Sequence, residues 1–316
     1  PHVITISAVI TCYNREHTIA EAVASVSAQT RTPLETIVVD DASTDEPVRV
    51  AESAVAHVVR MPVNRGSAAA RNEGIRAASG DAIAWLDSDD YWEPNHLEIV
   101  AGLLDRYPEA GVASSAVRRV GAASGTWYCS VPDGPPSDVF RKAFNDWIIP
   151  SITTITRRDA IIAAGCFDES ERFAVDFDAW LRLARRYRFV ASREVTANWR
   201  WHDAQLSGSL DRQLEATYRS RSNMLRSITN AGDNELASEL STLFRARWER
   251  DVQQAWDDEK TSWLRGLVEL APLVPGLPRP LVRKWAVRSR IPHRVVSVLR
   301  AYRARGKPVA GVNAAR

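Results

Sequence analysis

Short apolar runs alternate with amphipathic helical patterns along the N-terminal third of the chain, and this alternation constrains the fold more than any other feature. The apolar runs are suited to buried strands and lie at 4–11, 36–39, 57–61 and 82–86. The helical patterns that follow them are the stripe Ile19, Val23 and Val26, the segment 67–79, and the stripe Leu97, Val100 and Leu104. Such alternation predicts an α/β fold with a largely parallel sheet and helices on both faces.

Polar residues gather where three of these predicted strands end. Thr11 to Arg15 follows the first run, Asp40-Asp41 follows the second, and the tetrapeptide at 87–90 (Asp-Ser-Asp-Asp) follows the fourth. In open α/β sheets, ligands bind at the carboxyl ends of the strands. We therefore expect the three clusters to converge into one site at a single edge of the sheet.

The rest of the chain predicts two further regions. The middle contains a loop at 125–136, a strand at 152–156, a short helix at 158–164 and a helical stripe from Phe177 to Ala184. Beyond residue 210 the pattern is helical, and large apolar residues recur every four positions from Phe244 to Trp256. We divide the chain at 1–110, 111–210 and 211–316, as the two halves of one domain followed by a helical C-terminal region.

Composition excludes several classes of protein. Of the 316 residues, 45% are hydrophobic and 25% are charged, which is typical of a globular chain and not of a disordered one. Cys12, Cys129 and Cys166 are too few and too scattered for a disulfide framework or a zinc finger. Because neither a spanning helix nor a secretory leader is visible, we expect a cytoplasmic protein.

The segment Asp87-Ser88-Asp89 places two carboxylates one residue apart at a strand end. Oxygen ligands of this kind suit Mg²⁺ or Mn²⁺, which keep further positions for substrate phosphates. The alternative is a solvated acidic turn that begins a helix, since Asp and Ser are common at that position. The neighbouring clusters at the other strand ends favour the metal site.

Small residues open the predicted helix at 67–79. The N-terminus of a helix attracts phosphate, and Arg71 can pair with a diphosphate through two parallel hydrogen bonds. The alternative is an ordinary helix start with a surface arginine. Asp41 can accept a hydrogen bond from a base or a sugar, or it can serve a capping turn. The absence of G-x-G-x-x-G and of G-x-x-x-x-G-K-[ST] argues against a dehydrogenase and a P-loop ATPase.

Six segments in this order resemble the family-2 glycosyltransferases of the GT-A fold, whose nucleotide-binding sheet is Rossmann-like. The segments are VITCYNRE (9–16), VVDDASTD (38–45), NRGSAAARNEGI (64–75), AWLDSDDYWEP (84–94), GCFDES (165–170) and VDFDAWLRLA (175–184). The resemblance extends over about 4–208. It implies a transferase that uses a nucleotide-sugar donor, most often a UDP-sugar, and a divalent metal, Mn²⁺ or Mg²⁺.

The resemblance also assigns roles to individual positions of this chain. It assigns the base and ribose to Thr11, Tyr13, Arg15 and Asp41. It assigns the nucleotide and diphosphate to Asn64, Gly66 and Arg71. In the D-x-D element, Asp89 is the expected direct metal ligand, Asp87 the expected ribose or outer contact, and Asp90 the residue that orients the loop.

In this family a Glu-Asp pair precedes the Trp-Leu-Arg run, and here the pair reads Val175-Asp176. The resemblance makes Asp176 the catalytic base of an inverting transfer, with an altered neighbour; the alternative is a helix cap. It also places His202 near the metal or the diphosphate. Trp147 and Trp180 either stack on the acceptor sugar or pack in the core.

The charge of the chain is unevenly distributed. Residues 265–316 carry 12 Lys and Arg and a single acid, Glu269, so they have a net charge of +11, whereas the remainder has −9. We expect this basic region either to bind an anionic membrane surface, which would place the protein at the inner face of the cell membrane, or to pack on protein, including a second copy in a homo-oligomer. Nucleic acid is not an expected partner, because no recognition motif accompanies the charge.

Three functions are compatible with the predicted fold and motifs. The leading one is transfer of a sugar to an acceptor hydroxyl on a glycan, whether lipid-linked, part of the cell envelope or on a small molecule. A sugar-phosphate nucleotidyltransferase would require a Gly-rich basic loop after the first strand, and 11–16 does not supply one. A non-catalytic GT-A scaffold subunit is favoured only by Val175.

Overall fold

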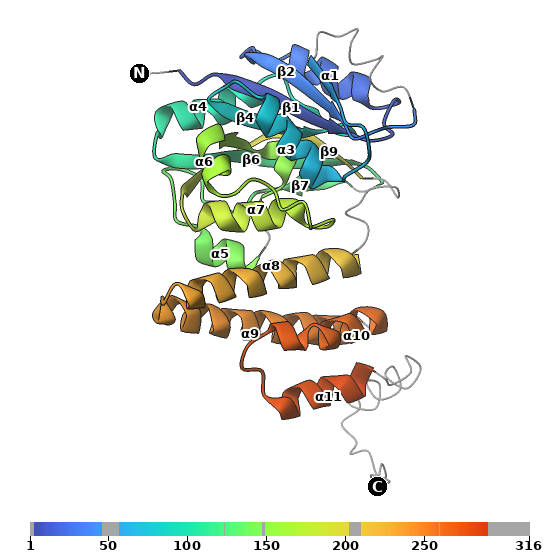
Figure 1. The fold of residues 1–316 in the computed structure, drawn as a ribbon, viewed down its shortest axis with the longest axis vertical. Coiled ribbons are helices and arrows are strands. Elements are labelled where there is room, and N and C mark those ends of the chain that lie inside the picture. The colour runs from blue at the N-terminus through green and yellow to red at the C-terminus, as the bar shows by residue number, and fades with distance from the viewer. Residues whose placement is uncertain are drawn as a thin grey trace. The chain divides into compact units, whose positions relative to one another are not determined.

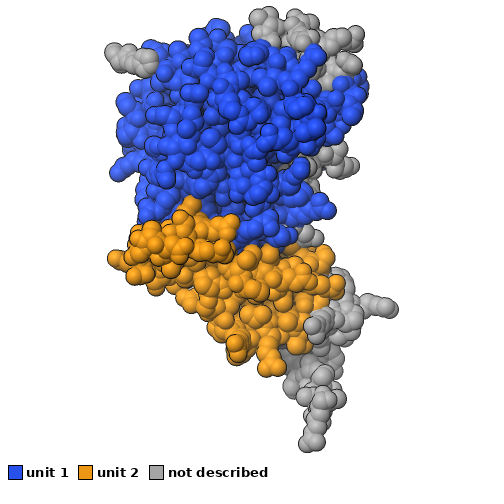
Figure 2. Space-filling view, in the orientation of Figure 1, with its two compact units in different colours: residues 1–220 blue, residues 221–316 orange. Residues whose placement is uncertain are grey.

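A computed structural model describes residues 3–45, 57–122, 124–146, 149–201, 210–258 and 260–289. The chain divides into two compact units, Pro1–Ser220 and Arg221–Arg316 (Figure 2). The two halves predicted at 1–110 and 111–210 therefore belong to one unit. The boundary of that unit falls inside helix α8, Leu210–Asn230, ten residues beyond the predicted one.

The first unit is built on one mixed sheet (Figure 1). Within the described residues its nine strands are β1 (Ile6–Cys12), β2 (Glu35–Asp40), β3 (His57–Arg60), β4 (Ala82–Asp87), β5 (Tyr91–Trp92), β6 (Ala110–Gly121), β7 (Gly125–Trp127), β8 (Ile155–Arg157) and β9 (Arg188–Trp201). They are ordered β3-β2-β1-β4-β8-β6-β9-β5, and β7 pairs with β6. The N-terminal part, β3-β2-β1-β4, is parallel throughout, as expected from the sequence.

Helices cover the sheet. Those of the first unit are α1 (Ile19–Ser27), α3 (Ser67–Ala77), α4 (His96–Arg106), α5 (Phe140–Asn145), α6 (Arg158–Ala163), α7 (Val175–Ala184) and the start of α8, with a 3₁₀ turn η1 at Ser151–Thr153. Ile6, Ala8 and Ile10 of β1 join the core cluster formed with α1 and α4. Val9 faces the opposite side, against Gly74 of α3. Because both faces are covered, β1 is apolar at nearly every position.

The middle of the unit differs from the sequence prediction. The expected strand at 152–156 begins instead as η1, and β8 starts only at Ile155. The Thr153 and Thr154 hydroxyls each donate to a carbonyl three residues earlier, which favours a turn over an extended strand. The sequence does not predict the long strands β6 and β9, and β7 lies in the segment predicted as a loop.

The second unit is helical, as the sequence predicts. Beyond the end of α8 it contains α9 (Asn234–Asp257), α10 (Thr261–Glu269), the 3₁₀ turn η3 (Ala271–Leu273) and α11 (Arg279–Ser289). The predicted stripe on α9 is buried at Phe244, Trp248 and Val252, and the Trp248 indole donates to the Leu267 carbonyl oxygen at 2.7 Å. Among the helices of the described ranges, none combines the length and hydropathy that a membrane crossing requires.

Candidate active site

Asp41 joins the end of β2 to the start of α3. Its side chain is buried, and its two carboxylate oxygens accept hydrogen bonds from the Arg65 and Gly66 backbone amides, each at 2.7 Å. Asn64 Nδ2 donates to the Asp41 carbonyl oxygen at 3.2 Å. Gly66 has a φ of 91°, a value that residues with a Cβ rarely adopt. Asp41 therefore fixes the loop that leads into α3.

The loops after β1 and β2 are tied to each other. Asn14 lies in the left-handed region, its amide donates to Ser43 Oγ at 2.9 Å, and its Oδ1 accepts from the Thr44 amide at 2.8 Å. The fold thus holds the first two predicted clusters together. Tyr13 keeps 44% of its surface exposed beside this junction, so its ring is available for contact with a ligand.

The Asp-Ser-Asp-Asp loop after β4 is held by arginines. Arg71 Nη2 lies 2.9 Å from Asp87 Oδ1, and Thr11 Oγ1 donates to the same oxygen at 3.4 Å. Arg15 Nε lies 3.3 Å from Asp89 Oδ2. These two ion pairs connect the first cluster, the third cluster and helix α3, which the sequence separates.

Asp90 anchors this loop to the far part of the sheet. It is buried, and its Oδ1 accepts from the Arg200 amide of β9 at 2.8 Å. Burial raises the pKa of Asp90 well above its usual range, and the neighbouring charges of Asp89 and Asp87 act in the same direction. Buried and bonded to the β9 backbone, Asp90 is placed to hold the loop.

Asp176 lies in the first turn of α7, after Ala174, which adopts left-handed backbone angles with a φ of 49°. Its Oδ2 accepts a hydrogen bond from Ser151 Oγ at 3.1 Å. Burial raises the pKa of Asp176 to about 6; the positive charge of Arg71 and the Ser151 hydroxyl oppose this rise, and the negative charge of Asp87 adds to it. Asp176 therefore lies close enough to Arg71 and Asp87 to interact with their charges.

A cluster of aromatic rings packs against Arg71. The Arg71 guanidinium lies over the Phe167 ring, 5.6 Å from its centroid, and Phe167 in turn packs edge-on against Trp85 and Trp180. Trp180 has only 2% of its surface exposed. It therefore takes the core position that was the alternative to acceptor stacking, because both faces of its ring are enclosed. Trp147 and His202 lie outside the described residues.

Val175 stands where the resemblance expects an acid, and it is 6% exposed. An ionised carboxylate in that position would be desolvated, whereas valine adds apolar contact at the start of α7. Asp178, two positions after Asp176, pairs with Arg182 at 2.8 Å. Arg182 also donates to the Ala164 and Cys166 carbonyl oxygens, so this pair connects α7 to the turn after α6.

Three residues of the site were given no role in the sequence analysis, although Asn72 lies within the motif at 64–75. Ser151 lies just before the predicted strand, and its contact with Asp176 depends on the η1 turn. Asn72 exchanges two hydrogen bonds of 2.9 Å with the Phe167 backbone and so holds the turn under Arg71. Arg172 lies against Gly66, where an added side-chain carbon would come within 3.1 Å of Arg172 Nη1. Each depends on a contact between distant segments.

The described residues contain no group of three or more His, Cys, Asp or Glu side chains placed to hold a metal ion. Asp87 and Asp89 nevertheless present two carboxylates on one loop, partly exposed at 37% and 19% of their side-chain surfaces. Magnesium and manganese are commonly held by one or two protein carboxylates and by substrate phosphates. The donor chemistry of this pair fits such an ion.

Curated proteins similar to this chain include an uncharacterised glycosyltransferase of Rickettsia prowazekii, which is 29% identical over 71% of this chain and 72% of its own length. A second relative, from Escherichia coli, is named UDP-Glc:alpha-D-GlcNAc-diphosphoundecaprenol beta-1,3-glucosyltransferase WfgD. It is 37% identical over 31% of this chain and 40% of its own length.

Solved structures show the same fold. TarS of S. aureus (residues 1–349), in complex with UDP-GlcNAc, matches with a TM-score of 0.68 and 19% identity over 96% of this chain and 92% of the other. Glucosyl-3-phosphoglycerate synthase of Mycobacterium tuberculosis, in complex with Mn²⁺, UDP and glucosyl-3-phosphoglycerate, matches with a TM-score of 0.52 and 22% identity over 69% and 80%. The GT-A fold expected from the sequence is confirmed.

The family model described as glycosyl transferase family 2 matches residues 7–165, which is half of the chain. The match contains the loops after β1, β2 and β4 and helix α3, and therefore the ion pairs that Asp87 and Asp89 make with Arg71 and Arg15. The sequence resemblance, the fold and the family model agree, and the chain belongs to glycosyl transferase family 2.

Proposed function

We propose that this glycosyltransferase moves a sugar from a UDP-sugar to an acceptor hydroxyl with inversion at the anomeric carbon, and that Asp176 is the base. The observation that carries the proposal is the position of the Asp176 carboxyl, which begins α7 and accepts a hydrogen bond from Ser151 Oγ at 3.1 Å. Burial raises its pKa to about 6, beside the charges of Arg71 and Asp87. A base needs a pKa near the working pH and must be ionised to accept a proton. Asp176 meets both conditions just above pH 6.

The transfer is a single displacement. Asp176 removes the proton from the acceptor hydroxyl while the hydroxyl oxygen bonds to the anomeric carbon. The bond from that carbon to the donor phosphate oxygen breaks, and its electron pair leaves with the nucleoside diphosphate. Arg71, with 7% of its side chain exposed, supplies positive charge for the leaving diphosphate, and that charge acts strongly because little water surrounds it.

The donor is held by the three loops at the carboxyl ends of β1, β2 and β4. Thr11, Tyr13 and Arg15 contact the base and ribose, and Asp41 shapes the loop from Asn64 to Gly66 against which the nucleotide lies. The support is that hydrogen bonds and ion pairs of Asn14, Asp41 and Arg71 connect these loops into one group. TarS and the mycobacterial synthase are described in complex with UDP-GlcNAc and with UDP, respectively.

We further propose that Mn²⁺ or Mg²⁺ binds at Asp89, with Asp87 beside it and His202 as an additional ligand. When bound, the ion would neutralise charge on the diphosphate. Arg15 and Arg71 would then exchange part of their contact with these carboxylates for contact with the phosphates. The pairs at 3.3 Å and 2.9 Å hold the two carboxylates in place before the donor binds.

The acceptor that we propose is a lipid-linked glycan of the cell envelope. The support is the E. coli relative, whose name gives GlcNAc-diphosphoundecaprenol as its acceptor. That relative is similar over 31% of this chain, which is less than the length of the first unit, Pro1–Ser220. Acceptor choice therefore needs its own measurement, with lipid-linked and water-soluble acceptors compared at equal concentration.

A donor panel tests the proposal. Thermal unfolding of the full chain is followed with UDP-glucose, UDP-galactose, UDP-GlcNAc and GDP-mannose, each with and without Mn²⁺. A true donor binds the native state and raises the midpoint temperature, by an amount that corresponds to about 2.7 kcal/mol at a hundredfold excess over its Kd. If none of the nucleotide sugars raises the midpoint, the chain is not a nucleotide-sugar transferase and the scaffold alternative replaces it.

Replacement of the base separates binding from chemistry. Asp176→Asn keeps the shape of the side chain and the bond from Ser151, so the donor-induced midpoint shift should persist. Turnover should fall by a factor on the order of 10² to 10⁴, the usual contribution of a positioned base. Asp178→Asn, on the same helix but paired with Arg182, is the matched control and should retain turnover. Equal turnover in Asp176→Asn and wild type would remove Asp176 from the mechanism.

A further inference from the structure

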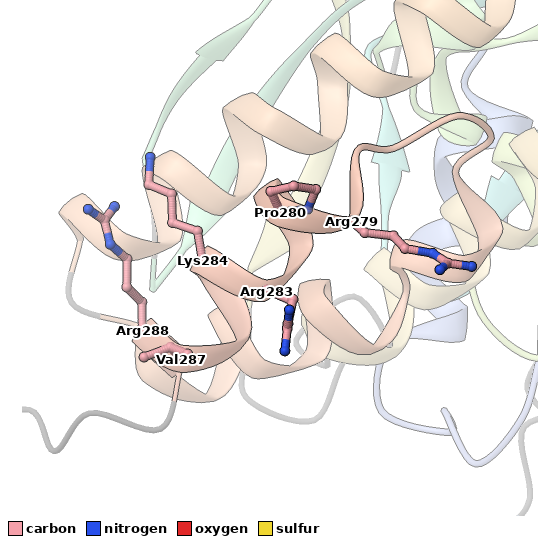
Figure 3. A pocket seen from close by; sticks show the side chains of 6 residues that line it. All are labelled: Arg279, Pro280, Arg283, Lys284, Val287 and Arg288. Atoms are coloured by element: carbon pink, nitrogen blue, oxygen red, sulfur yellow. The ribbon is translucent and has the colours of Figure 1, made fainter. Parts of the chain in front are cut away.

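One face of α11 concentrates positive charge. Arg279, Pro280, Arg283, Lys284 and Val287 are exposed on it, and together with Arg288 they line a shallow hollow (Figure 3). The spacing of 279, 283 and 287 by four residues puts these side chains in one row along the helix. We call this row, with Lys284 beside it, the cationic face of α11.

The charge of this face is not neutralised nearby. Within the described part of the chain, no ion pair involves Arg279, Arg283 or Lys284. The sequence from 270 to 316 contains neither Asp nor Glu, so its own neighbours in the chain offer no acidic partner. In the second unit, Asp251 is paired with Arg247 and Asp258 with Lys260. Lys284 Nζ lies 5.2 Å from the centroid of the Trp285 ring, a contact that leaves its charge without an acidic partner. Arg279, Arg283 and Lys284 can therefore pair with an external anion.

The opposite side of α11 is fixed to the protein. Trp285 has 3% of its surface exposed and packs edge-on against Trp256 of α9, with ring centroids 6.3 Å apart. The Arg288 guanidinium lies 4.8 Å from the Trp285 ring centroid and 5.1 Å from that of Trp256. Because Trp285 points inward, residues 279, 283 and 287 must point outward. The protein thus presents these cations on a supported helix.

Apolar groups stand among the cations. Val287 is 63% exposed, one of the most exposed large hydrophobic side chains of the described residues, and Pro280 is exposed on the same face. A row of arginines and lysine that also carries apolar side chains matches the boundary between lipid headgroups and acyl chains. A nucleic-acid backbone or an acidic peptide would pair with the positive charges but would leave the Val287 side chain exposed to water.

We propose that the cationic face of α11 docks on an anionic phospholipid surface, with Arg279, Arg283 and Lys284 on the headgroup phosphates and Val287 inserted between them. The chain continues this chemistry, because residues 290–316 add seven Lys and Arg and no acid. The proposed docking surface belongs entirely to the second unit and is independent of the transfer reaction.

Vesicle co-sedimentation of the full chain tests this docking. The probes are phosphatidylcholine vesicles and vesicles of equal parts phosphatidylcholine and phosphatidylglycerol. The chain should partition onto the anionic vesicles alone. Arg279→Gln with Arg283→Gln should lower the partition coefficient by a factor on the order of thirty, since each basic residue near such a surface contributes about fivefold.

Three companion variants make the result specific. Arg226→Gln with Arg250→Gln removes the same charge from exposed positions elsewhere in the second unit and should leave partitioning nearly unchanged. Arg279→Lys with Arg283→Lys keeps the charge and should retain binding, whereas a site built for bidentate recognition of free phosphate would lose it. Val287→Ser should weaken binding severalfold while all charges remain.

Several outcomes would overturn the proposal. Equal partitioning of the Arg279/Arg283 glutamine variant and its matched control would assign the interaction to other basic residues. Binding to neutral and anionic vesicles alike would remove the headgroup contact. Release by millimolar inorganic phosphate at constant ionic strength, binding of duplex DNA in place of vesicles, or self-association lost in the glutamine variant would each assign the face to a different partner.

Discussion

At the scale of single residues, the site depends on how its acids are distributed between chemistry and structure. Asp87, Asp89, Asp90 and Asp176 are all close to other acids, yet burial separates their behaviour. Asp90 is enclosed and holds the β4 loop to β9, while Asp87 and Asp89 remain partly exposed and pair with arginines. Asp176 is intermediate between the enclosed Asp90 and the partly exposed Asp87 and Asp89, and burial raises its pKa to about 6. The same residue type thus serves three roles.

Ser151 should set the pH at which Asp176 becomes active. Its hydroxyl donates to Asp176 at 3.1 Å and lowers the pKa of that carboxyl against the effect of burial. In Ser151→Ala the pKa should therefore rise above about 6. The acid limb of kcat/KM should move to higher pH by about one unit or less, since a single hydrogen bond contributes about 1 kcal/mol.

The measurement is the pH profile of kcat/KM, with Ser151→Thr as the control that keeps the hydroxyl. Turnover of Ser151→Ala on the alkaline plateau should stay near that of the wild type, because Asp176 is ionised there in both proteins. A uniform loss at every pH, with the limb unmoved, would mean that Ser151 only supports the fold of η1.

At the scale of elements, α3 shows how closely a helix can approach the sheet. Gly74 faces β1, and a side-chain carbon at that position would come within 2.4 Å of Val9 Cγ1. The helix carries Arg71 one turn before this contact, so the close approach also sets where the guanidinium meets Asp87. Glycine is required here for space and not for an unusual backbone angle.

Gly74→Ala should lower the free energy of unfolding by about 1–3 kcal/mol, because the added methyl group overpacks the interface with β1. For a unit of this size, that corresponds to a midpoint about 2–4 °C lower for each kcal/mol. Gly102→Ala in α4 is the matched control, since nothing lies within 4 Å of the added carbon. It should be stabilised by up to about 1 kcal/mol.

Both variants are compared by thermal unfolding and by donor-induced midpoint shift. If Gly74→Ala were as stable as Gly102→Ala, α3 would be free to move away from β1. The position of Arg71 would then not depend on this contact.

At the scale of the whole molecule, stability depends on groups that folding removes from water. His96 is fully buried, its ring stacks on Trp92, and its Nδ1 lies 2.7 Å from Thr196 Oγ1. Burial lowers the pKa of His96 from 6.5 to about 3. Between these two values the unfolded chain binds a proton at His96 that the folded chain does not, so the protein loses stability as the pH falls.

His96 should therefore add a slope of about 1.4 kcal/mol per pH unit to the free energy of unfolding between pH 6.5 and about 3. Asp90 and Asp176, whose pKa values burial raises, contribute with the opposite sign in wild type and variant alike. Urea unfolding of wild type and His96→Gln at a series of pH values isolates the histidine. Parallel curves for the two proteins would show that His96 is not the source of the slope.

The division of charge is also a property of the whole molecule. The segment that gives the chain its basic end belongs to the second unit, and the acids of the site belong to the first. In the proposed arrangement the two units meet different anions, a nucleoside diphosphate and a phospholipid surface. Salt should weaken the second interaction more than the first, because salt screens exposed charges much more than buried ones.

The sequence by itself determined the α/β class, the largely parallel sheet that contains β1, β2 and β4, and the three polar loops at one sheet edge. These follow from local patterns, since a covered strand must be apolar on both faces and a parallel sheet brings its strand ends together. It also determined the helical second unit through the stripe at Phe244, Trp248 and Val252. Six motifs in the family's order were sufficient to identify the family.

The remaining features of the fold and of the site were decided by tertiary structure alone. Several features depend on partners far away in the chain. They are strands β6 and β9, the η1 turn beside Asp176, the burial of Trp180 and the inward position of Trp285. Local propensity carries no information about such contacts, because one residue type packs or is exposed according to what covers it. Burial, which gives Asp176 a pKa of about 6 and gives the cationic face of α11 its outward direction, exists only once the chain has folded.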